Sequence, residues 1–129
     1  MGAMTAARED LLRAIYAAFN AREIDTVLAT MTPDVDWPNA WEGGRVVGHG
    51  AVRDYWTRQW SEIDPTVAPV GFTQREDGRV AVDVAQTVRS LGGEVIAEGR
   101  VVHVYAFDPA GRVARMDVEE PQADPGAAA

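Results

Sequence analysis

The second half of the chain is a run of predicted strands joined by very short turns. Each strand is rich in β-branched or aromatic residues, and the turns contain the aspartate and glycine residues that tight reversals favour. The expected strands cover about residues 66–76, 80–90, 94–107 and 112–120, with turns at 77–78, 92–93 and 108–111. Strands joined this closely pair in antiparallel order. This half therefore predicts a four-stranded antiparallel sheet.

The first half of the chain predicts three helices, in which apolar residues recur at three- and four-residue spacing. The first helix ends at Asn20, Pro33 stops the second, and the third covers about residues 51–63. A short strand that begins at Asp34 runs into an irregular loop between the last two helices. Helices followed by strands predict an α+β fold, in which a curved sheet wraps over the helices as a cone with an open end.

Charge and composition exclude several classes of function. The formal net charge of −8 argues against nucleic acids, whose phosphates require a basic surface, and against anionic membrane surfaces. No apolar run approaches the ~20 residues that span a bilayer, and no secretory signal is apparent. The chain has no cysteine, which fits a cytoplasmic location. No spacing of histidines and carboxylates predicts a metal site, and no glycine-rich loop predicts phosphate binding.

The last predicted hairpin places a histidine on the inner face of the sheet. If residues 108–111 form the turn, Phe107 pairs with Arg112, and counting outward pairs His103 with Met116. One face is then expected to carry Val101, His103, Tyr105, Met116 and Val118. That face is apolar apart from the imidazole and the tyrosine hydroxyl, so we expect it to face the helices. The chain is expected to form one domain over residues 5–120, followed by a flexible tail at 121–129.

The segments LLRAIYAAFNAREIDTVLATMTPDVDW, VVGHGAVRDYW and VVHVYAFDPAGRVARMDVEE lie between residues 11 and 120. They resemble the nuclear transport factor 2-like superfamily, and within it the SnoaL-like polyketide cyclases and the ketosteroid isomerases. The resemblance implies a cone-shaped α+β barrel, with three N-terminal helices packed on a curved, mainly antiparallel sheet around a deep apolar pocket. It also implies a homodimer that forms through the outer face of the sheet.

The resemblance also implies positions for catalytic residues. The isomerases use a tyrosine on the first helix, whose position falls on Ile15, with Tyr16 one residue later. Their catalytic base, an aspartate after the first strand, corresponds to Asn39. Their protonated aspartate corresponds to His103, which keeps a group that can donate a hydrogen bond to a ligand oxygen.

The candidate catalytic residues are His103, Tyr105 and Asp36. His103 is expected either to act as a general acid, base or hydrogen-bond donor, or to be a core histidine whose hydrogen bonds are satisfied by neighbours such as Tyr105. Asp36 lies beside Trp37, and a carboxylate in an apolar cleft has a raised pKa that suits a base. The alternative is that Asp36 is an ordinary solvated carboxylate at the surface.

Aromatic side chains are the main candidates for ligand contact. Trp37 and Trp41 lie in a proline-containing segment near the expected mouth of the cone, whereas Trp56 on the third helix suits either ligand contact or plain core packing. A histidine–aspartate pair of the cyclases falls, by the resemblance, on the positions of Met116 and Val118. The expected ligand-binding residues are Tyr16, Trp37, Asn39, Trp41, Tyr55, Trp56, Met116 and Val118.

The sequence thus predicts a small-molecule pocket protein of the SnoaL-like type. As an enzyme it is expected to catalyse isomerisation or cyclisation of an apolar carbonyl compound by proton transfer, without a cofactor. The alternatives are a non-catalytic ligand-binding or dimerisation module and an epoxide hydrolase, which requires Arg53 or Arg89 to point inward. A homodimer is predicted through Val102 and Val104 on the outer face of the sheet.

Overall fold

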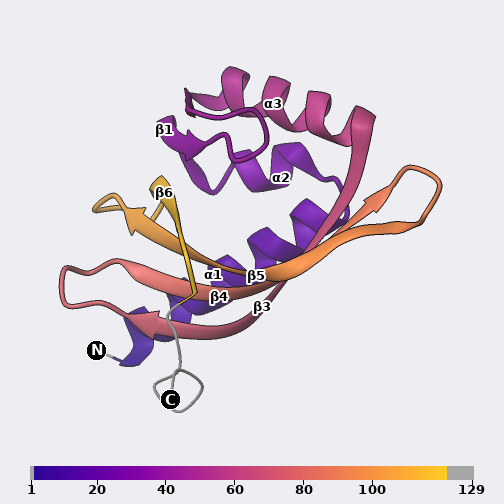
Figure 1. The fold of residues 1–129 in the computed structure, drawn as a ribbon. Coiled ribbons are helices and arrows are strands. Elements are labelled where there is room, and N and C mark those ends of the chain that lie inside the picture. The colour runs from indigo at the N-terminus through magenta and orange to yellow at the C-terminus, as the bar shows by residue number, and fades with distance from the viewer. Residues whose placement is uncertain (1, 122–129) are drawn as a thin grey trace, which may run out of the picture.

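Three helices and a curved six-stranded sheet make up the structure, a computed structural model that describes residues 2–121 (Figure 1). The elements are α1 (Gly2–Asn20), α2 (Ile24–Leu28), β1 (Met31–Pro38), β2 (Arg45–Val47), α3 (His49–Glu62), β3 (Ile63–Gln74), β4 (Val80–Ser90), β5 (Val95–Phe107) and β6 (Val113–Glu119). The strand order is β2-β1-β6-β5-β4-β3. This arrangement confirms the predicted α+β fold with three helices packed on a mainly antiparallel sheet.

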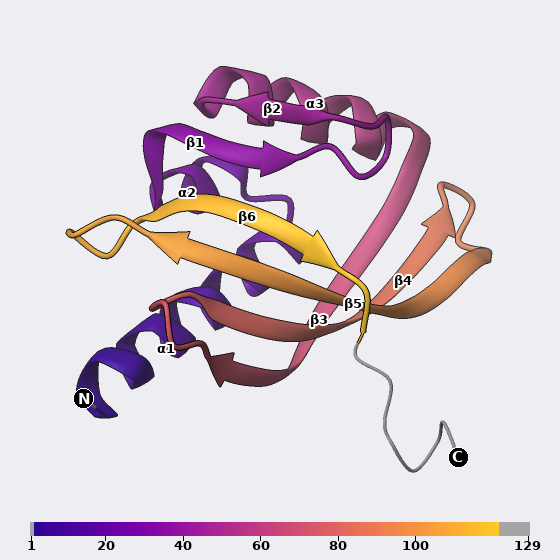
Figure 2. The same ribbon diagram turned by 60° about the vertical axis from the view of Figure 1, so that its left-hand side comes forward.

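The sheet is larger than the sequence predicts because β1 and β2 join it. β1 pairs in parallel with β6 and antiparallel with β2, so the sheet continues past the predicted meander (Figure 2). β4 and β5 extend beyond β6 as a long hairpin, and β3 pairs with β4 along its whole length. In the described part of the chain, no helix is long and apolar enough to cross a membrane. The tail predicted at 121–129 lies, apart from Pro121, outside the described residues.

The β5–β6 hairpin differs from the predicted register by two residues. Phe107 pairs with Val113 because the loop is one residue longer than expected, and a bulge then follows, so His103 lies opposite Val118 rather than Met116. The longer loop and the bulge each shift the pairing by one residue. Side chains alternate between the two faces of a strand, so one shift moves each side chain of β6 to the opposite face and the second shift moves it back. His103 and Met116 therefore share the inner face, as predicted.

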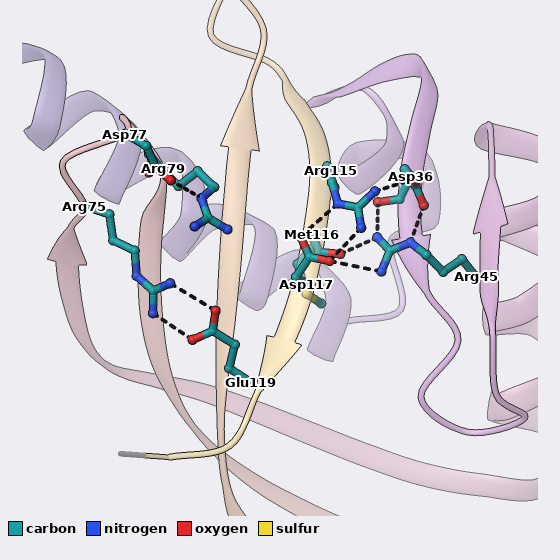
Figure 3. Close-up of polar contacts among 9 residues, drawn as sticks. All are labelled: Asp36, Arg45, Arg75, Asp77, Arg79, Arg115, Met116, Asp117 and Glu119. Atoms are coloured by element: carbon teal, nitrogen blue, oxygen red, sulfur yellow. Dashed lines mark hydrogen bonds and ion pairs between the residues drawn. The ribbon is translucent and has the colours of Figure 1, made fainter. Parts of the chain in front are cut away.

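The outer face of the sheet carries a layer of alternating charges (Figure 3). Arg115 contacts Asp36 at 2.8 Å and Asp117 at 2.9 Å, and Arg75 binds Glu119 through hydrogen bonds of 2.8 and 3.0 Å. Hydrogen bonding to these arginines lowers the pKa of Asp117 and of Glu119. We call this set the ionic layer; its members are Asp36, Arg45, Arg75, Asp77, Arg79, Arg115, Asp117 and Glu119.

Val102 and Val104, the residues predicted to form a dimer contact, are buried within the single chain. Their side chains are only 8% and 0% exposed, although they lie on the outer face opposite Glu119 and Asp117. The charged side chains of the ionic layer extend over the strands that carry them. These valines therefore offer no apolar surface to a partner. The homodimer remains a prediction, but Val102 and Val104 do not support it.

Arg45 links three strands at the edge of the ionic layer. Its guanidinium forms an ion pair with Asp36 and donates hydrogen bonds to the carbonyl oxygens of Asp36 at 3.1 Å and Met116 at 2.6 Å. The parallel register between β1 and β6 is irregular between Met31 and Asp36, so their ladder is incomplete. Arg45 thus connects β2 and β1 to β6 where backbone pairing is sparse.

Replacing Arg45 by methionine should lower the free energy of unfolding by about 1–3 kcal/mol, because the Met116 carbonyl loses a charged hydrogen-bond donor. Urea unfolding followed by circular dichroism measures the change. The matched control is Arg53→Met, since Arg53 pairs with the exposed Asp25 on the molecular surface and should cost less than ~0.5 kcal/mol. An equal loss of unfolding free energy in both variants would show that Arg45 stabilises the pairing of the strands no more than a surface ion pair does.

Candidate functional site

A cavity of about 390 Å³ lies between the inner face of the sheet and the helices. This volume is within the range of small-molecule sites, roughly 300–1,000 Å³. The candidate residues that line it are Tyr16, Trp37, Trp41, Tyr55, Trp56, His103, Tyr105, Met116 and Val118. The exposed side chains of Trp41, Ile96 and Val118, at 38%, 58% and 40%, mark the mouth of the cavity.

One wall of the cavity is a cluster of aromatic rings centred on Trp56. Its ring meets Trp37 edge-on at 5.6 Å between centroids, meets Phe19 edge-on at 5.4 Å and stacks on Trp60 at 5.9 Å. Trp56 is only 2% exposed, so it belongs to the core and also lines the cavity. Ring faces and edges held in fixed positions suit a flat apolar ligand.

His103 is the end of a hydrogen-bonded chain that begins on its own strand and passes through α1. The Tyr105 hydroxyl donates to the Tyr16 hydroxyl at 2.8 Å, and the Tyr16 oxygen lies 2.8 Å from Nδ1 of His103. The rings of Tyr16 and His103 also stack, with centroids 5.9 Å apart and planes at 13°. With Tyr105 donating to it, Tyr16 directs its own proton at Nδ1, which acts as the acceptor.

Burial keeps all three groups of this chain uncharged. Desolvation lowers the pKa of His103 to about 4, so its imidazole is neutral at pH 7. Desolvation also raises the pKa of Tyr16 and of Tyr105, so both phenols stay protonated. A neutral imidazole that accepts at Nδ1 carries its proton on Nε2. Nε2 forms no hydrogen bond with a described residue, and His103 lines the cavity, so this donor is available to a ligand.

No charged side chain is found among the described residues that line the cavity. Its polar groups are hydroxyls, amides, indoles and the imidazole of His103. Burying an unpaired charge is costly, so the cavity suits an uncharged ligand. Within residues 2–121, no group of three or more histidine and carboxylate side chains is arranged to hold a metal ion.

Asp36 and Asn39 do not line the cavity, which corrects two expectations. Side chains alternate along β1, so Trp37 faces inward and Asp36 faces outward, where it pairs with Arg45 and Arg115. The Asn39 amide donates to Glu42 Oε1 at 2.9 Å, and its Oδ1 accepts from the Glu42 backbone N–H at 2.7 Å. Asn39 therefore closes a turn after β1, and neither residue is placed to touch a ligand.

Two glutamines that the sequence did not single out for ligand binding do line the cavity. Gln59 follows Tyr55 by one turn of α3, and its amide lies 3.5 Å from the Tyr55 hydroxyl. Gln86 lies on β4 and has the same parity as the buried Val82 and Val84, which was the signal for its inward position. Neither of the arginines that an epoxide hydrolase requires, at 53 and 89, lines the cavity.

The SnoaL-like domain family matches residues 12–116. Because the match covers most of the chain, the protein belongs to the SnoaL-like domain family, within the predicted superfamily of nuclear transport factor 2-like proteins. No curated protein matches the chain.

Solved structures agree with this assignment. TerC crystallised with polyporic acid is 27% identical, with 88% of this chain and 91% of that chain covered and a TM-score of 0.75. A nuclear transport factor 2-like protein of unknown function from Burkholderia pseudomallei is 26% identical, with 88% and 90% covered and a TM-score of 0.75. A Mycobacterium tuberculosis protein in complex with estradiol-17beta-hemisuccinate shares the fold at 19% identity, with 86% and 91% covered and a TM-score of 0.73.

Proposed function

We propose that the protein binds an uncharged, largely apolar carbonyl compound and polarises its carbonyl group through His103. The observation that carries this proposal is the hydrogen-bonded chain from Tyr105 through Tyr16 to Nδ1 of His103, which leaves the Nε2 proton free in an aromatic cavity. Two of the similar structures contain small organic molecules, polyporic acid and estradiol-17beta-hemisuccinate, which supports a small-molecule ligand.

The proposed interaction is a hydrogen bond from Nε2 of His103 to the carbonyl oxygen. Donation by Tyr16 to Nδ1 withdraws electron density from the imidazole and makes Nε2–H a stronger donor. The donor is fixed before the ligand arrives and works in a site shielded from water, where it stabilises negative charge that develops on the oxygen. Because burial raises the pKa of both tyrosines, they hold their protons and orient the imidazole.

The finer proposal is isomerisation or cyclisation by proton transfer. A polarised carbonyl makes the adjacent C–H more acidic, so its proton leaves to a base, and the bonding electrons form the C=C bond of an enolate whose negatively charged oxygen accepts a hydrogen bond from His103. No carboxylate is among the described residues that line the cavity, so the base is water or a group of the ligand itself. The same observation favours the second candidate function, a binding module that performs no reaction.

A matched ligand pair tests the proposed hydrogen bond. The protein should bind para-acetylbiphenyl about tenfold more tightly than para-ethylbiphenyl, because one hydrogen bond to the carbonyl is worth roughly 1–1.5 kcal/mol. His103→Phe keeps an aromatic ring but removes the donor, and should bind both compounds alike. Calorimetric titration measures the affinities. Equal affinity of the unaltered protein for the two compounds would overturn the proposal.

The same ketone separates the enzyme from the binding module. In deuterium oxide, an enzyme that promotes enol formation should accelerate exchange of the acetyl protons, which mass spectrometry detects. His103→Phe should lose this acceleration while circular dichroism shows a folded protein. Binding of the ketone without faster exchange would favour the binding module.

A further inference from the structure

The polar side chains that β4 and β5 contribute to the cavity lie at two separate places. His103 lies opposite Val82 of β4, and it forms one polar end together with the two tyrosine hydroxyls. Gln86 lies four residues further along β4, which corresponds to about 13 Å of strand. Val88, two residues beyond Gln86, still lines the cavity. The Gln86 amide is therefore a second polar group within the length of the cavity, near the part of the mouth that Ile96 marks.

Gln86 is free to bind a ligand. Its side chain is half-buried and lines the cavity, but forms no hydrogen bond with a described residue. Its cross-strand neighbour on β5 is Gly99, at which an added Cβ would meet nothing within 4 Å. Opposed residues share a face of the sheet, so open space lies beside the Gln86 amide. An amide both donates and accepts, and so can pair with a hydroxyl, a carbonyl or another amide.

Between these two ends the sheet presents apolar side chains to the cavity, whereas α3 adds the Tyr55 hydroxyl and the Gln59 amide. Trp37 and Trp56 line the cavity from β1 and α3, and Val67 lines it from β3, directly opposite Gln86. A ligand that reaches from one polar end to the other must therefore have an apolar body. The described lining residues include no charged side chain, so a charge at either end of the ligand would have no ionic partner in the cavity.

Building on the proposed function, we propose that the ligand is an elongated, flat compound with an uncharged hydrogen-bonding group at each end, one held by His103 and the other by Gln86. The carbonyl lies at the buried His103 end. A hydroxyl, carbonyl or amide group lies at the Gln86 end, close to the mouth. Gln86 thus selects among carbonyl compounds by what they carry at the end remote from the carbonyl.

A third biphenyl tests this assignment. Para-acetyl-para′-hydroxybiphenyl adds a hydroxyl at the far end of para-acetylbiphenyl and should bind about fivefold more tightly, as expected for one further neutral hydrogen bond. Gln86→Met keeps the length of the side chain but removes the amide, and should abolish this preference. It should still bind para-acetylbiphenyl more tightly than para-ethylbiphenyl, which shows that the His103 end of the cavity is intact.

The matched control is Thr87→Val, which removes a polar atom from the adjacent residue on the opposite face of β4, and should keep the fivefold preference. Two results would overturn the role of Gln86: no preference for the hydroxylated compound in the unaltered protein, or a preference that survives in Gln86→Met. In either case tighter binding of para-acetylbiphenyl than of para-ethylbiphenyl would still support the role of His103. Loss of that difference would instead reject the proposed function.

Discussion

Replacing Trp56 by alanine should lower the free energy of unfolding by about 3–5 kcal/mol, the usual range for removing a large buried aromatic side chain. Trp56 is 2% exposed, and its ring packs against those of Phe19, Trp37 and Trp60. The neighbouring rings come from three different elements and cannot all close on the gap. Urea unfolding followed by far-ultraviolet circular dichroism measures the change without depending on tryptophan fluorescence.

Trp41→Ala is the matched control for this substitution. Trp41 also lines the cavity, but it is 38% exposed at the mouth and should contribute less than ~1 kcal/mol to stability. Its removal should instead weaken binding of para-acetylbiphenyl. A loss of stability in Trp41→Ala as large as in Trp56→Ala would contradict this division between core and mouth.

Stability should fall as the pH is lowered from 6.5 to 4 because of His103. Burial lowers the pKa of His103 from 6.5 to about 4 in the folded protein. Between these values the unfolded chain binds a proton that the folded protein does not, so protonation favours unfolding. The stability is complete above pH 6.5 and is lost as the pH approaches 4. The shift corresponds to a loss of about 3 kcal/mol over this range.

The comparison of the unaltered protein with His103→Phe isolates this contribution. Both proteins share the carboxylates that titrate in acid, so the difference between their unfolding free energies at each pH reports on His103. The unaltered protein should lose about 3 kcal/mol relative to the variant between pH 7 and pH 4. Parallel pH profiles would mean that the imidazole is not desolvated in the folded protein.

Local patterns explain which parts of the fold the sequence predicts. The antiparallel hairpins and the first and third helices follow from spacing and turn residues within short segments, and they form close to where expected. The second helix is shorter than expected: it ends at Leu28, and β1 begins at Met31, so Pro33 lies within a strand rather than at the end of the helix. The parallel pairing of β1 with β6 joins segments at opposite ends of the domain, and no local pattern records it. Without that pairing the facing direction of β1 is undetermined. This is why Asp36 was expected inside, although it belongs to the ionic layer.

The candidate site shows the same division. The inner position of His103 follows from alternation along one hairpin, and it survives an error in register. Its hydrogen bond to Tyr16 joins residues 87 positions apart, so it depends on how α1 lies against the sheet. The role of Gln86 depends on the cavity itself. Alternation along β4 predicts that Gln86 faces inward with the valines. It does not predict that a cavity lies beside the Gln86 side chain.

The longer loop and the bulge of the β5–β6 hairpin determine which changes in chain length this wall of the cavity tolerates. The bulge at Ala114 restores the facing direction that the longer loop reverses. Deleting that single residue would exchange the two faces of β6, turning Asp117 into the cavity and Met116 onto the surface. Insertions or deletions of two residues would leave both faces unchanged. Related sequences that keep the same inward-facing residues on β6 should therefore differ in length in this hairpin by an even number of residues.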